Sequence, residues 1–97
     1  MKITNKIKGL VNTYIDMAAS ESEQNTSFKL AFNLIVKNFQ CDKFVAISVL
    51  DFFIYKSCYF DDRYLEDFQK TNAILKQLGV SFKVEKLHNG AMDIIQV

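Results

Sequence analysis

The chain has 97 residues, of which 49% are hydrophobic and 13% aromatic, and its formal net charge is +1. This length supports one domain with a single core, and the hydrophobic content excludes an intrinsically disordered chain. A near-neutral charge provides no overall field that would attract a phosphate backbone. Eleven of the 12 basic residues are lysine, with Arg63 as the exception. Because arginine is the usual bidentate reader of guanine, sequence-specific nucleic-acid binding is disfavoured.

Two helices are predicted in the first part of the chain. Between about residues 3 and 19, apolar residues recur at three- and four-residue steps, which is the period of one helical face. The polar segment 20–25 predicts a loop, and a second helix is expected over about 26–39, with its N-cap among residues 25–27. We expect these helices to form an antiparallel pair whose lysines lie on a solvated face.

The stretch 44–60 is the most apolar part of the chain, with Asp51 and Lys56 as its only charges and neither Gly nor Pro. Odd and even positions are both apolar, a pattern shared by a strand buried on both faces and by a buried helix. Its β-branched and aromatic residues favour a strand, interrupted by a surface bend near Asp51 or divided in two. Asp42 as an N-cap would favour a helix instead. The stretch is too short and too interrupted for a membrane span of about twenty apolar residues.

An amphipathic helix is predicted over residues 61–78. Asp61 or Asp62 can cap it, acidic residues crowd its first turns, and Gly79 is placed for a left-handed residue after its end.

A β-hairpin is predicted at the end of the chain, because Asn89 and Gly90 lie between the alternating segments 80–87 and 91–97. The chain as a whole therefore predicts an α+β fold in a single domain over residues 1–97. Its parts are an N-terminal helical pair, a central apolar strand region, an amphipathic helix and a C-terminal antiparallel β-hairpin. The helices are expected to cover one face of a small antiparallel sheet.

No set of catalytic or metal-binding residues can be assembled from the sequence, which lacks a Gly-rich phosphate loop, a Cys-x-x-Cys motif and a nucleophile elbow. Cys41 and Cys58 are expected to be reduced structural thiols, and His88, the single histidine, is expected in a solvent-facing turn. The first residues carry Lys and Asn where a signal peptide would be apolar, which predicts a cytoplasmic protein. We therefore expect no enzyme activity, no cofactor, no metal and no membrane attachment.

The densest charge feature of the chain is acidic and lies beside aromatic residues. Helix capping accounts for Asp61 and Asp62, whereas Glu66 and Asp67 exceed what a cap requires. Aromatic residues are enriched at interface anchors, and acidic residues belong at an interface rim. We therefore predict a contact surface for a protein partner, formed by Tyr59, Asp61, Asp62, Tyr64, Glu66 and Asp67.

The function expected from these features is that of a small protein-binding module. Small size, the lack of catalytic groups and a composition rich in Lys, Asn, Ile and Phe resemble those of small phage or mobile-element proteins, including host-takeover inhibitors and anti-CRISPR proteins. This resemblance implies an inhibitor or adaptor that occupies the surface of a host protein.

The alternative is a winged-helix-type DNA-binding regulatory protein. If residues 44–60 were helical, the element order over residues 26–97 would resemble a winged helix, with 61–78 as its recognition helix. The residues on its wing would be Lys83, Lys86, His88 and Asn89. The acidic residues at the start of the recognition helix would repel phosphates, which disfavours nucleic acid as the partner. Self-association through an exposed hairpin edge, giving a homodimer, is a third hypothesis.

Overall fold

The computed structural model describes residues 2–17 and 25–97 of the chain. In chain order the elements are α1 (Lys2–Asp16), α2 (Thr26–Phe39), α3 (Lys43–Tyr55), β1 (Ser57–Phe60), the 3₁₀ turn η2 (Asp62–Tyr64), α4 (Leu65–Gln77), β2 (Phe82–Lys86), the 3₁₀ turn η3 (His88–Gly90) and β3 (Met92–Gln96). The predicted α+β class and the C-terminal antiparallel hairpin are confirmed. Most of the loop predicted at 20–25, and residues 18–19 of the first predicted helix, lie outside the described residues.

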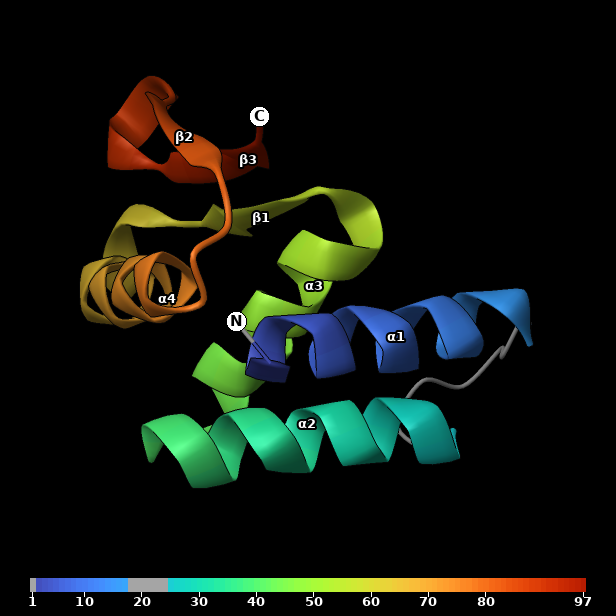
Figure 1. Cartoon of the computed structure of the whole chain (residues 1–97). Helices are drawn as coiled ribbons and strands as arrows, with labels where there is room; N and C mark the ends of the chain where they lie inside the picture. The colour runs from blue at the N-terminus through green and yellow to red at the C-terminus, as the bar shows by residue number, and fades with distance from the viewer. Residues whose placement is uncertain (1, 18–24) are drawn as a thin grey trace.

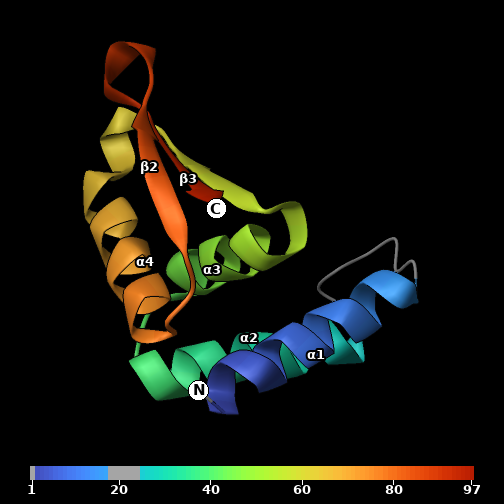
Figure 2. The ribbon, with the colours of Figure 1, turned by 45° about the horizontal axis from the view of Figure 1, so that its top comes forward.

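Helices α1 and α2 form the antiparallel pair that the sequence predicts, and they lie side by side in Figures 1 and 2. The side chain of Asn25 accepts hydrogen bonds from the backbone N–H groups of Ser27 and Phe28, at 2.9 and 3.2 Å. Two bonds to the first turn satisfy donors that have no partner within the helix, so they determine where α2 begins. The buried residues of α1 are Thr4, Ile7 and Val11.

The central apolar stretch is helical over residues 43–55, so the predicted strand is wrong there and correct only over 57–60. The carboxylate of Asp42 caps α3 by accepting a hydrogen bond from the N–H of Val45 at 2.9 Å. Figure 1 shows α3 in the middle of the molecule, with the α1–α2 pair on one side and the sheet on the other. A helix covered on several sides is apolar all round, which removes the periodicity that would identify it. The bend predicted near Asp51 is also wrong, because Asp51 lies in mid-helix.

The sheet is antiparallel with the strand order β1-β3-β2, so β3 is its central strand. Ile94 of β3 is fully buried and lies opposite Cys58 of β1 and Val84 of β2. Both outer strands pair on one side only among the described residues, and β2 is largely solvent-exposed. The hairpin edge required by the self-association hypothesis is therefore present.

Aromatic rings join one face of the sheet to two helices. The ring of Phe60 on β1 lies 6.3 Å from Phe44 on α3 and 5.9 Å from Phe68 on α4. On β2, the ring of Phe82 lies 6.3 Å from Phe52 on α3. Helices α3 and α4 thus cover this face. The expectation that the N-terminal helical pair also covers it is wrong, because α1 and α2 pack mainly on each other and on α3.

Residues with positive φ end α4 and turn the hairpin where the sequence predicts them. Gly79 has a φ of +74°, and the N–H groups of Gly79 and its successor bond to carbonyls in the last turn of α4, at 3.0 and 3.4 Å. Asn89 and Gly90 have φ of +66° and +79° in the hairpin turn. Only a few residue types adopt this conformation at low cost, so these turns can be predicted from the sequence.

Two buried threonines differ in their hydrogen bonding. The hydroxyl of Thr4 on α1 donates to the carbonyl oxygen of Leu78, directly after α4. The hydroxyl of Thr71 on α4 is fully buried and has no hydrogen-bond partner among the described residues. The first threonine therefore ties α1 to the end of α4, whereas the second carries an unpaired polar group into the core.

We expect the same substitution to have opposite effects at these two positions. Thr4→Val should lower the free energy of unfolding by about 1–2 kcal/mol, because the Leu78 carbonyl loses its donor. Thr71→Val should raise it by about 1 kcal/mol, because an unpaired hydroxyl leaves the core. Urea unfolding of the two variants measures both effects. Threonine and valine are both β-branched, so changes of equal sign would contradict the hydrogen bonding described.

Candidate functional site

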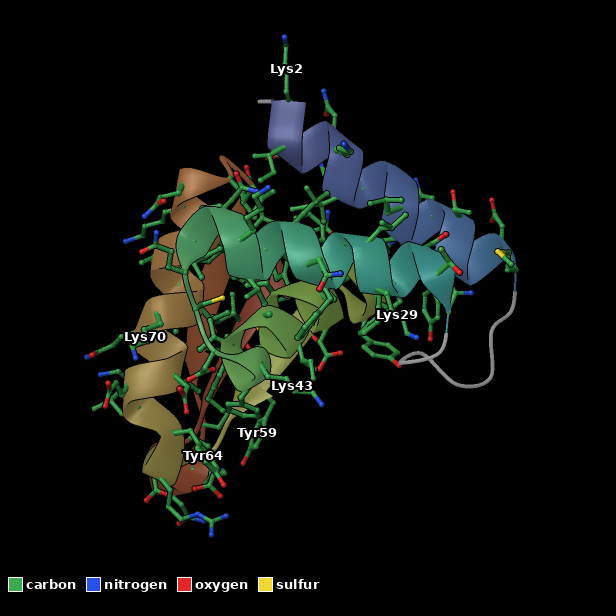
Figure 3. All side chains as sticks on the ribbon, turned by 90° about the horizontal axis from the view of Figure 1, so that it is seen from below. Lys2, Lys29, Lys43, Tyr59, Tyr64 and Lys70 are labelled. Atoms are coloured by element: carbon green, nitrogen blue, oxygen red, sulfur yellow. The ribbon has the colours of Figure 1, made fainter. Side chains whose placement is uncertain are left out.

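The residues of the predicted acidic–aromatic surface belong to three elements. Tyr59 lies on the sheet face away from α3 and α4, opposite Asp93, and its side chain is exposed. Tyr64, at the end of η2, lies on the α3 side instead, where its ring is 5.3 Å from that of Phe44. The two tyrosines, which are labelled in Figure 3, thus belong to different sides of β1.

Asp61 and Asp62 have local structural partners. Asp61 accepts a hydrogen bond from the N–H of Arg63 at 3.0 Å and lies 3.2 Å from the guanidinium of Arg63. The bond from this N–H, followed by a side-chain bond with Asp62, lowers the pKa of Asp61, whereas the same side-chain bond raises the pKa of Asp62. The Cβ of Asp62 also lies 3.2 Å from the position that a Cβ at Gly90 would occupy. The η2 turn therefore lies against the hairpin tip.

Glu66 and Asp67 occupy the first turn of α4, because this helix begins at Leu65 rather than at Asp61. A negative charge there is favoured by the helix dipole. Glu66 also forms an exposed ion pair with Lys70, at 3.2 Å. The two residues that seemed to exceed the needs of a cap therefore stabilise the true start of the helix.

A groove of about 280 Å³ runs between α2 and α3. Its apolar side chains come from both helices, and Lys29 of α2 and Lys43 of α3 both project from the face shown in Figure 3. No described residue that lines this groove is acidic. The lining residues are Phe28, Lys29, Phe32, Asn33, Lys43 and Ile47.

Phe44 follows the lining residue Lys43 in α3 and lies one helical turn before Ile47, but its ring packs against Phe60 and Tyr64 rather than in the groove. Phe44 and Tyr64 are 44% and 41% exposed although their rings are in contact, and the guanidinium of Arg63 lies 5.6 Å from the centre of the Tyr64 ring. Exposed aromatic residues beside an arginine are the residue types enriched at binding hot spots. We call the groove together with Phe44 and Tyr64 the α2–α3 surface.

A second groove, of about 270 Å³, runs along the other side of α2, between α2 and α1. Asn33 lines both grooves, and no described residue that lines the second one is acidic. The lining residues are Lys6, Leu10, Leu30, Asn33, Leu34 and Lys37. The face built from α1, α2 and the start of α3 is therefore apolar in its grooves and basic around them.

The near-neutral net charge conceals this asymmetry. Over residues 1–47 there are six lysines against four acidic residues, Asp16, Glu21, Glu23 and Asp42. Over residues 48–97 there are six basic and seven acidic residues. The lysines of the helical half are Lys2, Lys6, Lys8, Lys29, Lys37 and Lys43.

The two thiols are free, as expected. Cys58 is buried, and burial raises its pKa to about 12. Burial also raises the pKa of the half-buried Cys41.

Asp51 is half-buried with a pKa raised by desolvation, and no ion pair joins it to another described residue. His88 is exposed in η3, the kind of position that the sequence predicts.

Within residues 2–17 and 25–97, no group of three or more His, Cys, Asp or Glu side chains is arranged to hold a metal ion. No described helix combines the length and the apolar character needed to cross a membrane. Searches against protein-family models, curated proteins and solved structures find no match to this chain.

The winged-helix alternative shares the order of elements but not the details. The two helices that this alternative requires, α3 and α4, are both present, but strand β1 and the 3₁₀ turn η2 lie between them, whereas a helix-turn-helix joins its two helices by a short turn. On the wing, Lys83 and Lys86 lie on opposite faces of β2, because they are three positions apart and side chains alternate along a strand. Lys83 pairs with Glu85 at 3.4 Å, and His88 and Asn89 are exposed in the turn. These residues do not form one basic stripe.

Sequence reasoning predicted Tyr64 but missed Phe44, Lys29 and Lys43. The strand assigned to the central stretch would have placed Phe44 in the core. The signal that could have found it was Asp42, because a helix starting there places Phe44 and Ile47 on one face.

Proposed function

We propose that this chain is a non-enzymatic protein-binding module that acts as an inhibitor or adaptor by occupying a surface of its partner. The observation that carries this proposal is the exposed pair Phe44 and Tyr64 beside the α2–α3 groove. Covering exposed apolar surface is favourable by about 25 cal/mol per Å², and aromatic anchors contribute most to such interfaces.

The shape and the charge of the surface support the same function. The α2–α3 groove is concave and its floor is apolar, so it can receive side chains of a partner. Lys43 borders the groove, and Arg63 lies against Tyr64, which places basic groups around an apolar centre. An apolar centre with a charged rim is the usual arrangement of a transient protein interface.

Nucleic acid is the second candidate partner, which α4 would contact as a recognition helix and the β2–β3 hairpin as a wing. The acidic residues Glu66 and Asp67 lie at the start of α4, the end of a recognition helix that would approach the bases. They would repel phosphates, and the wing lysines point away from each other. We therefore place protein binding first.

The proposal is tested by affinity capture of the tagged protein from a bacterial lysate, with and without nuclease. We expect a stoichiometric protein partner that survives nuclease, and we expect Phe44→Ala with Tyr64→Ala to reduce its capture by about tenfold or more. Tyr55→Ala is the matched control, because Tyr55 is 69% exposed at the far end of α3. Thermal unfolding of each variant verifies that the fold persists.

Two results would contradict this assignment. If Glu66→Lys with Asp67→Lys abolishes capture while the Phe44 and Tyr64 variant retains it, the acidic–aromatic surface is the site instead. If the captured material is nucleic acid that is lost in moderate salt, the winged-helix alternative replaces protein binding.

A further inference from the structure

We infer that the segment of the partner that the α2–α3 groove receives is an amphipathic α-helix with acidic residues on both flanks of its apolar face. This inference rests on the proposed function, because it describes what a protein partner would place in the groove.

The first reason is the shape of the groove. Two neighbouring helices form its walls, and Phe28, Phe32 and Ile47 supply its apolar floor. Its volume of about 280 Å³ is at or below the lower end of the range for small-molecule pockets, roughly 300–1,000 Å³. A groove of this size can accept a few apolar side chains. An amphipathic helix presents such side chains in one row, at intervals of three and four residues.

The second reason is the charge on the two walls. Lys29 comes from α2 and Lys43 from α3, so basic side chains border the apolar floor from both helices. The remaining polar lining residue, Asn33, is neutral, and no described lining residue is acidic. Complementary charges across an interface suppress wrong partners and determine register. The complement of this groove is therefore an apolar row with Glu or Asp on each side.

The same features disfavour other anionic partners. Nucleic acids and anionic membranes would also attract Lys29 and Lys43, but phosphates gain nothing from a floor of phenylalanine and isoleucine. The apolar side chains line a recess between two helices, whereas a membrane surface engages apolar residues that protrude. An amphipathic helix with acidic flanks can contact the apolar floor and both lysines at the same time.

The inference is tested by selecting peptides on the intact protein from a displayed library of amphipathic helices. Each peptide carries Leu or Phe along one face, and the positions on both flanks vary among Glu, Gln and Lys. We expect the wild-type protein to enrich Glu over Lys by about tenfold or more at both flanks. Lys29→Glu with Lys43→Glu should reverse this preference. The matched control is Lys76→Glu with Lys86→Glu, which changes the net charge equally on exposed residues outside the groove and should keep the preference for Glu.

Several results would overturn the inference. One is the absence of enriched helical peptides on the wild-type protein, and another is a preference for Gln or Lys. Equal effects of the two double variants would show that overall charge, rather than the groove, selects the peptides. Binding of duplex DNA or phosphatidylglycerol vesicles that depends on Lys29 and Lys43, without peptide enrichment, would identify a different partner class. If peptides fail while capture still depends on Phe44 and Tyr64, this inference falls and the proposed function stands.

Discussion

Replacing Phe60 with alanine should lower the free energy of unfolding by about 3–5 kcal/mol. The side chain is 1% exposed, and its ring lies within 6.3 Å of Phe44 on α3 and 5.9 Å of Phe68 on α4. Both helices contact the sheet through β1. A cavity at this position would therefore remove packing contacts among three elements, β1, α3 and α4. Chemical denaturation with urea gives the loss as a shift of the midpoint.

Tyr59→Ala is the matched control for this prediction. Tyr59 is the neighbouring residue on the same strand, but its side chain is 59% exposed on the uncovered face of the sheet. We expect its removal to change the free energy of unfolding by less than about 1 kcal/mol. Similar losses for the two variants would show that β1 does not separate a buried face from an exposed one.

At alkaline pH, the wild-type protein should lose stability faster than a Cys58→Ala variant. Burial raises the pKa of Cys58 from 9.0 to about 12. Below pH 9 the thiol is protonated in both the folded and the unfolded state, so it adds no pH dependence. Between pH 9 and 12 the unfolded chain releases this proton while the folded chain retains it, so unfolding becomes more favourable.

The expected size of this effect follows from linkage. Stability should fall by about 1.4 kcal/mol for each pH unit within this window, which gives roughly 2 kcal/mol at a pH of about 10.5. Urea unfolding of the wild type and the variant, at neutral pH and at this pH, measures the difference between them. All other ionisable groups are common to the two proteins, so the comparison isolates the contribution of Cys58. Parallel loss of stability in the two proteins would show that Cys58 reaches solvent in the folded state.

The parts of the fold that the sequence predicted well are those governed by local interactions. Asn25 caps α2 through two backbone bonds, and Gly79 ends α4 in the left-handed conformation. Asn89 and Gly90 turn the hairpin in the same way. Each of these residues interacts with others only a few positions away in the chain, so its effect can be predicted without knowing which distant segments pack nearby.

The candidate site was only partly predictable for a related reason. Tyr64 was identified because it lies among acidic residues in the chain. Its contact with Phe44 joins residues twenty positions apart, and the Lys29 wall of the groove comes from a helix that precedes both. Neither the contact between Tyr64 and Phe44 nor the place of Lys29 in the groove can be predicted from a local pattern of residues.

By itself, the sequence determined an α+β fold, the N-cap of α2, the end of α4, the hairpin turn and a free buried thiol at Cys58. Only the tertiary structure decided that residues 43–55 are helical and that a lysine-bordered apolar groove lies between α2 and α3. The physical reason is burial on several sides. The α1–α2 pair and the sheet cover α3 together, so nearly every position of α3 is apolar, and the pattern that separates helix from strand is absent.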